Sequence, residues 1–127
     1  MTNILGSGQT LPKGGTLVSP NGTYTLTMQV DGNLVLTKNG TVIWETGTSG
    51  SHVVCVMETS GDLFVNGIIP WHSGTFSPGA YLVLQNDGTL VIDSVAGVQI
   101  WSPPELLVLV VEATVNGQDS ASPGAGE

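Results

Sequence analysis

The sequence has very few positive charges. Only Lys13 and Lys38 oppose ten acidic residues among 127, so the formal net charge is −8. Proteins that bind nucleic acid or anionic membranes use clustered lysine and arginine to neutralise phosphates, and this chain has no such cluster. We therefore expect neither nucleic acid nor an anionic membrane surface as a partner.

Cysteine and long hydrophobic runs are also scarce. The single cysteine, Cys55, cannot form an intrachain disulfide, so the fold must depend on packing and is compatible with a reducing compartment. The longest apolar run, residues 106–111, is far shorter than the roughly 20 residues of a membrane-spanning helix. The N-terminus has neither the basic start nor the apolar core of a secretory signal. The sequence predicts cytoplasmic synthesis, or release by a non-classical route, and no membrane insertion.

Helix-forming residues are few, and glycine, threonine, valine and leucine give the chain a strand-and-turn composition. Three segments repeat one pattern: residues 24–37, 54–66 and 81–93 align on Gly32, Gly61 and Gly88, which are 29 and 27 residues apart. Each segment is followed by a tryptophan, namely Trp44, Trp71 and Trp101. The repeats, at about residues 24–48, 53–75 and 81–103, predict an all-β domain of three small sheets around a common axis. The tryptophans are predicted to fill the space where the sheets meet.

The C-terminal part of the sequence has a different character. Residues 106–111 are apolar on both faces, so the strand expected over residues 105–111 must be covered on both sides. It is predicted either to pair within the domain or to exchange with a second subunit, which makes a homodimer through this strand the expected assembly. We expect one domain over residues 1–111 and a flexible tail over residues 112–127, because residues 116–127 are small and polar.

The turn of the first repeat predicts how its two strands pair. A three-residue loop, residues 30–32, closed by Gly32 in the left-handed region, pairs Gln29 with Asn33. A two-residue loop would mix polar and apolar residues on both faces. The three-residue register sorts the faces, with Leu26, Met28, Leu34 and Leu36 in the core and Thr25, Thr27, Gln29, Asn33, Val35 and Thr37 outside.

The same register in the other repeats predicts the rest of the core. It buries Cys55, Met57, Leu63 and Val65 in the second repeat, and Leu82, Leu84, Leu90 and Ile92 in the third. Cys55 then occupies the place of a leucine in the other copies. It is predicted to be a small buried hydrophobic residue rather than a reactive thiol.

The outer face of the first hairpin carries a compact polar cluster. Gln29 and Asn33 are opposite each other, Asp31 is at the tip, and Val35 lies behind them as an exposed apolar side chain. Sugar hydroxyls both donate and accept, so they pair well with amides and carboxylates, while the C–H patch of a sugar ring favours an apolar contact. An Asp-Gly pair is ordinary turn chemistry, but the turn needs neither Gln29 nor Asn33. The cluster predicts a site for a neutral sugar.

Residues 29–37, QVDGNLVLT, resemble the Q-x-D-x-N-x-V-x-Y signature of the bulb-type, snowdrop-like mannose-binding lectins, and the flanking pieces SPNGTYTLTMQ and IWETGT agree with it. The resemblance covers roughly residues 5–103. It implies the β-prism II fold, with three four-stranded antiparallel sheets and pseudo-threefold symmetry. It also implies a non-catalytic lectin for terminal mannose or mannose-containing glycans, in which Asp31 and Asn33 share the axial 2-hydroxyl, Gln29 binds ring hydroxyls and Val35 contacts the ring carbons. A shallow site of this kind is expected to bind weakly and to gain avidity from oligomerisation.

The chain departs from this signature in every copy. Thr37 replaces the final tyrosine of the first copy, which removes an aromatic wall and weakens one hydroxyl contact. The third copy is a degenerate second site made of Gln85, Asp87, Thr89, Val91 and Asp93. The second copy keeps almost nothing of the signature and is predicted to be silent for mannose, with Glu58, Ser60, Asp62, Phe64 and Asn66 at the five places.

Two other classes of function are alternatives to a lectin. A β-prism protein-interaction or toxin-like (bacteriocin-like) module that has lost mannose binding would explain the missing tyrosine in every copy. A glycosidase would need two separated carboxylates, but Glu58 and Asp62 are too close around a turn on an open surface. His52 and His72 lie in different repeats, without metal-ligand or nucleophile spacing. We therefore expect no enzyme, no cofactor and no metal site.

Overall fold

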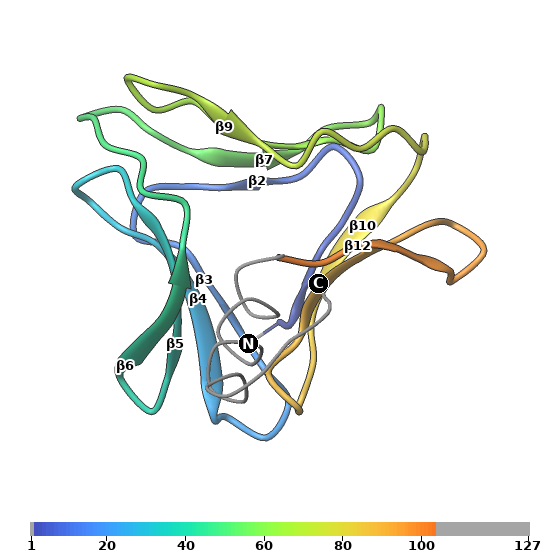
Figure 1. The fold of residues 1–127 in the computed structure, drawn as a ribbon, viewed down its shortest axis with the longest axis horizontal. Coiled ribbons are helices and arrows are strands. Elements are labelled where there is room, and N and C mark those ends of the chain that lie inside the picture. Colours follow the sequence, from blue (N-terminus) through green and yellow to red (C-terminus); the bar gives the residue numbers. More distant parts are fainter. Residues whose placement is uncertain (1, 104–127) are drawn as a thin grey trace, which may run out of the picture.

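The computed structural model describes residues 2–103, and these form three four-stranded antiparallel sheets that are the sides of a prism (Figure 1). Sheet 1 contains, in spatial order, β3 (Thr16–Val18), β4 (Tyr24–Met28), β5 (Leu34–Lys38) and β6 (Thr41–Glu45). Sheet 2 contains β2 (Thr10–Leu11), β7 (Cys55–Met57), β8 (Leu63–Val65) and β9 (Trp71–His72). Sheet 3 contains β1 (Ile4–Leu5), β10 (Tyr81–Leu84), β11 (Leu90–Asp93) and β12 (Gln99–Trp101). The predicted all-β, β-prism II architecture is confirmed.

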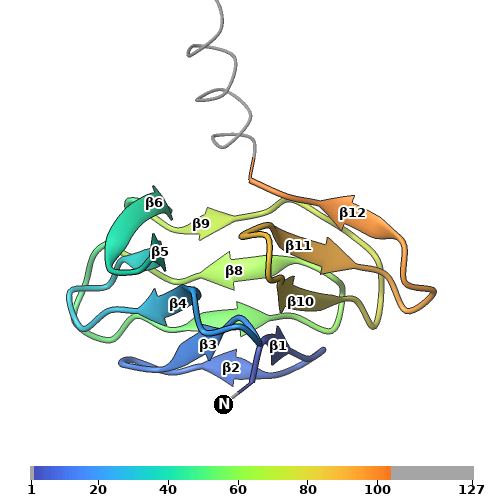
Figure 2. The ribbon, with the colours of Figure 1, turned by 90° about the horizontal axis from the view of Figure 1, so that it is seen from below.

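Sheets 2 and 3 are each built from two separate parts of the chain, whereas sheet 1 is formed by four consecutive strands. The N-terminal strands β1, β2 and β3 give one edge strand to sheets 3, 2 and 1 in turn, and each repeat then adds three consecutive strands. Figure 2 shows that β1, β2 and β3 lie at one end of the prism, and that β6, β9 and β12 lie at the other. The described residues contain no helix long and apolar enough to span a membrane.

The first hairpin has the register predicted from its turn. Gln29 N donates to Asn33 O at 2.9 Å, Gly32 N donates to Gln29 O at 3.1 Å, and Gly32 has a φ of +92°. Thr27 pairs with Val35 across the two strands. The loop therefore has three residues, and the polar and apolar side chains separate onto opposite faces as expected.

The core lies inside the prism, where the inner faces of the three sheets meet. All twelve residues predicted to be buried by the three hairpins have no exposed surface: Leu26, Met28, Leu34, Leu36, Cys55, Met57, Leu63, Val65, Leu82, Leu84, Leu90 and Ile92. Burial raises the pKa of the Cys55 thiol to about 12, because the apolar surroundings disfavour the thiolate. Cys55 is thus the inert buried residue that the alignment predicted.

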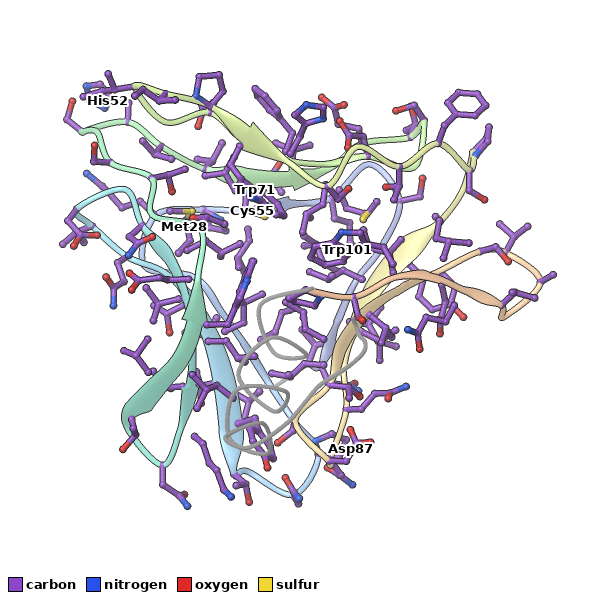
Figure 3. All side chains as sticks on the ribbon, viewed as in Figure 1. Met28, His52, Cys55, Trp71, Asp87 and Trp101 are labelled. Atoms are coloured by element: carbon purple, nitrogen blue, oxygen red, sulfur yellow. The ribbon has the colours of Figure 1, made fainter. Side chains whose placement is uncertain are left out.

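The three tryptophans form a triangle around the prism axis. Their ring centroids are 5.7, 5.8 and 6.3 Å apart and their planes meet at 68–72°, which is the edge-to-face geometry favoured by aromatic rings. Figure 3 shows Trp71 and Trp101 directed toward the interior, whereas Asp87 lies at the rim. Because Trp44, Trp71 and Trp101 come from β6, β9 and β12, the triangle lies at the end of the prism where the repeats finish. The predicted role of the tryptophans is confirmed.

In sheets 1 and 2, the loop that follows the third strand of the repeat holds the tip of the hairpin. In sheet 1, Thr48 Oγ1 donates to Gly32 O at 2.7 Å and Gly50 N donates to Asp31 O at 3.1 Å. The loop after β9 holds the second hairpin in the same way. These bonds fix the backbone on which Asp31 is placed.

Two predictions lie outside the described residues. They are the exchanged strand over residues 105–111, with the homodimer that depends on it, and the flexible tail over residues 112–127. Both stay predictions.

Candidate functional site

The predicted polar cluster is brought together at the end of the hairpin between β4 and β5. Gln29 and Asn33 form the last rung of the ladder, and Asp31 Oδ1 accepts a hydrogen bond from Asn33 N at 3.0 Å. This Asx turn holds the Asp31 carboxylate against the backbone at the hairpin tip. Gln29 makes no side-chain hydrogen bond to any other described residue. The cluster therefore offers a donor and acceptor from Gln29 beside the carboxylate of Asp31.

The Asn33 amide has a structural role that the sequence did not reveal. Its Oδ1 accepts hydrogen bonds from Gly47 N at 2.9 Å and Thr46 Oγ1 at 3.3 Å, and its Nδ2 donates to Glu45 Oε1 at 2.5 Å. Because a backbone N–H only donates and a carboxylate accepts, these partners fix which way the amide faces. One of the two Nδ2 hydrogens is donated to Glu45, so Asn33 has one N–H left for a ligand. The side chain of Asn33 makes no hydrogen bond to the turn of residues 30–32, as expected, but it anchors the segment after β6.

Val35 is not the exposed apolar side chain that was expected. Only 2% of its surface is accessible. The reason is that β5 has a neighbour on each side: Val35 lies opposite Thr27 on β4 and opposite Glu45 on β6. The sequence of the β4–β5 hairpin does not show the second neighbour, β6, which covers the other side of Val35. A ligand on this face can therefore touch little more than the edge of Val35.

Glu45 joins the cluster because of a bulge in β6. From the tight turn at Asn39 and Gly40, a regular ladder would place Trp44 opposite Val35. The register instead shifts by one residue, so Trp44 lies opposite Leu36 and Glu45 opposite Val35. The extra residue turns Trp44 into the core and Glu45 onto the outer face. Sequence reasoning missed Glu45, and the only available signal was a charged residue at the end of the apolar run VIW.

Thr37, which replaces the tyrosine of the family signature, is turned away from a ligand. Its Oγ1 donates to Thr25 O, the carbonyl of its cross-strand partner, at 3.3 Å. The hydroxyl hydrogen is thus used within the sheet. Thr37 can contact a ligand only through its methyl group or as an acceptor.

The third copy places its polar groups in contact with one another. Thr89 Oγ1 is 2.6 Å from both Gln85 Oε1 and Asp87 Oδ1, and Thr89 N donates to Asp87 Oδ1 at 3.0 Å. The side-chain and backbone hydrogen bonds from Thr89 lower the pKa of Asp87. Val91 is 1% exposed, so it is buried like Val35. Asp93 pairs with Tyr81 at the other end of the hairpin, away from this cluster.

The second copy uses the same scaffold with different chemistry. Asp62 stands in the place of Asn33, and its Oδ1 accepts from Gly74 N at 2.9 Å and Ser73 Oγ at 3.0 Å. Its Oδ2 is 3.1 Å from His72 Nδ1, and His72 lies opposite Phe64 as Glu45 lies opposite Val35. No amide N–H is offered here, and a phenyl ring fills the place of the valine. Among the described residues, no cluster of histidine, cysteine and acidic side chains could hold a metal ion.

No protein-family model and no functionally curated protein matches the sequence, but several solved structures do. A monomeric monocot mannose-binding lectin from Gastrodia elata is 34% identical, with 80% of this chain and 96% of that chain covered and a TM-score of 0.73. The mannose-specific agglutinin from snowdrop (Galanthus nivalis) bulbs, complexed with methyl α-D-mannoside, is 36% identical, with coverages of 73% and 90% and a TM-score of 0.66. A mannose-specific lectin from Dutch crocus (Crocus vernus) is 32% identical, with coverages of 80% and 95% and a TM-score of 0.66.

Proposed function

Because the chain belongs to the bulb-type mannose-binding lectin family, we propose that it binds terminal mannose on the outer face of sheet 1, without catalysis. The observation that carries the proposal is the geometry of Asn33, whose amide is held by the segment after β6 with one N–H left to donate. Asp31 and Gln29 are the neighbours of Asn33 at this end of the hairpin, since Asp31 Oδ1 accepts from Asn33 N at 3.0 Å and Gln29 N donates to Asn33 O at 2.9 Å.

The three side chains complement the chemistry of a sugar hydroxyl. A hydroxyl accepts one hydrogen bond and donates another, so its oxygen accepts from Asn33 Nδ2 while its hydrogen is donated to Asp31. Gln29 is able to pair with the neighbouring hydroxyl in either role. Such charge-assisted hydrogen bonds are stronger than neutral ones. Val35 adds little, because it is almost fully buried.

The affinity of one site is expected to be low. The tyrosine contact is absent, and Thr37 donates to its neighbouring strand instead of a ligand. We expect a dissociation constant of about 1 mM, which corresponds to about −4 kcal/mol. Sheet 3 is a weaker second site because Gln85, Asp87 and Thr89 bind one another, and sheet 2 is silent for mannose. Avidity through a homodimer stays part of the proposal.

The test is an NMR titration of the intact protein with methyl α-D-mannoside, for the wild type and Asn33→Asp. An aspartate keeps the oxygen that holds Gly47 N, as Asp62 does in sheet 2, but it loses the N–H donor and faces Glu45. We expect the variant to unfold cooperatively and to bind at least tenfold more weakly. The matched control, Asp62→Asn, should bind like the wild type.

Two results would contradict the proposal. Full affinity in Asn33→Asp would remove Asn33 from the site. A wild type that binds no mannoside would instead favour the protein-interaction or toxin-like module. Two observations support that function: Val35 is buried, and Thr37 Oγ1 donates its hydrogen to Thr25 O within the sheet. A protein partner captured by the same wild type, with no hit on a glycan array, would then support that second function.

A further inference from the structure

Glu45 lies beside the proposed sugar site but belongs to none of the signature positions. It ends β6, is exposed, lies opposite Val35, and its Oε1 accepts from Asn33 Nδ2 at 2.5 Å. His72 occupies the same place on β9 and reaches back to Asp62 in the same way. Two different residue types thus make the equivalent contact. The position of Glu45 is therefore set by the register of the third strand of the sheet and not by the type of side chain.

The amide of Asn33 fixes how far a bound sugar would be from Glu45. An amide nitrogen directs its two hydrogens about 120° apart, and one of them points to Glu45 Oε1. A ligand oxygen that accepts the other hydrogen at an ordinary length of about 2.9 Å lies about 5 Å from Glu45 Oε1. The next hydroxyl of the same ring then comes within hydrogen-bond reach of the carboxylate.

We infer that Glu45 is a fourth sugar-contacting residue of the sheet 1 site, and that its charge, together with that of Asp31, selects neutral sugars against sugars that bear a carboxylate. The inference rests on the proposed function. Glu45 accepts a hydrogen bond from a second hydroxyl on the side of the site where the signature provides no group. It thereby offsets part of the contact that Thr37 does not make.

The two acidic side chains of the site are not paired with any cation of residues 2–103. In the described part of the chain, neither Asp31 nor Glu45 forms an ion pair, since the single ion pair there joins His72 to Asp62. Lys38 is near the ring of Tyr24, 5.9 Å from its centroid, at the opposite end of the β4–β5 ladder. Lys13 precedes Gly14, whose N donates to Met28 O at 2.6 Å on the β3 side of the hairpin, and it forms no ion pair with a described residue. The two carboxylates outnumber this one lysine near the site, so at low salt they repel an acidic sugar over about 10 Å or more, whichever way its ring faces.

The experiment compares methyl α-D-mannoside with methyl α-D-mannosiduronate by NMR titration at low salt. Glu45→Ala should bind the neutral mannoside about tenfold more weakly than the wild type, a difference of about 1.4 kcal/mol. Glu45→Gln retains an acceptor for Asn33 and for the sugar but loses the charge, so it should bind the neutral mannoside about threefold more weakly than the wild type, a smaller loss than in Glu45→Ala. Its preference for the neutral over the acidic sugar should fall by about tenfold.

The matched control is Glu58→Gln, which removes one negative charge from sheet 2. It should change neither the affinity for the neutral mannoside nor the preference for the neutral over the acidic sugar. The inference is overturned if Glu45→Ala binds the mannoside as tightly as the wild type or more tightly. It is also overturned if Glu58→Gln narrows the preference as much as Glu45→Gln does. A wild type that binds no mannoside defeats the proposed function and this inference together, whereas these variant results defeat the role of Glu45 alone. Tryptophan fluorescence during thermal unfolding checks that each variant is folded.

Discussion

Gly32→Ala tests whether the hairpin that carries the site is held as closely as the structure indicates. Gly32 closes the loop with a φ of +92°, and a Cβ built on it would lie 2.4 Å from Gly50 N and 2.6 Å from Ser49 C. These are backbone atoms of the loop that clasps the hairpin tip, so they cannot move aside like the end of a flexible side chain. The substitution must shift either the hairpin or the clasping loop.

The expected loss of stability has two parts. A left-handed conformation costs an alanine about 1–2 kcal/mol, and forcing an extra carbon into a filled space costs about 1–3 kcal/mol more. We therefore expect Gly32→Ala to lower the free energy of unfolding by about 2–5 kcal/mol. Gly40→Ala is the matched control: Gly40 has a φ of +87° in the β5–β6 turn, but nothing lies within 4 Å of the place that its Cβ would take. Gly40→Ala should therefore lower the free energy of unfolding only by the conformational cost of about 1–2 kcal/mol.

The measurement is urea unfolding followed by tryptophan fluorescence, because the tryptophan triangle reports on the packing of all three sheets. Gly32→Ala should also weaken mannoside binding, since Asp31 N–H, C=O and carboxylate belong to the displaced tip. Equal destabilisation in Gly32→Ala and Gly40→Ala would refute the close approach of the hairpin tip to Ser49 and Gly50.

Two further predictions concern titratable groups. The folded protein should not react with iodoacetamide at pH 8, because burial raises the pKa of Cys55 to about 12, and mass spectrometry showing modification before unfolding would contradict this. Since the unfolded thiol ionises at about 8.5 while the folded thiol stays neutral, the free energy of unfolding should also fall as pH rises above about 9. Thr89→Val should raise the pKa of Asp87 toward its ordinary value by removing the side-chain hydrogen bond that contributes most to lowering it. Carboxyl NMR titration measures this, and an unchanged pKa would show that the Thr89 hydroxyl does not bind Asp87.

The sequence by itself determined the features that depend on two strands and the turn between them. The position of Gly32 selects a three-residue loop, and the loop fixes which side chains share a face of the β4–β5 hairpin. Because three repeats agree on one register, the core residues and the burial of Cys55 followed without knowledge of the whole fold. The pairing of Gln29 with Asn33 followed for the same reason.

Only the tertiary structure decided what the site has on its β6 side. The bulge in β6 moves Trp44 into the core and Glu45 opposite Val35, and the tight turn that precedes it gives no sign of this shift. Asn33 then binds Glu45 and the segment after β6, so a residue of the proposed sugar site also holds the fold. The physical reason is that a third strand is positioned by the packing of its tryptophan against the other two sheets, which is a contact between residues far apart in the sequence.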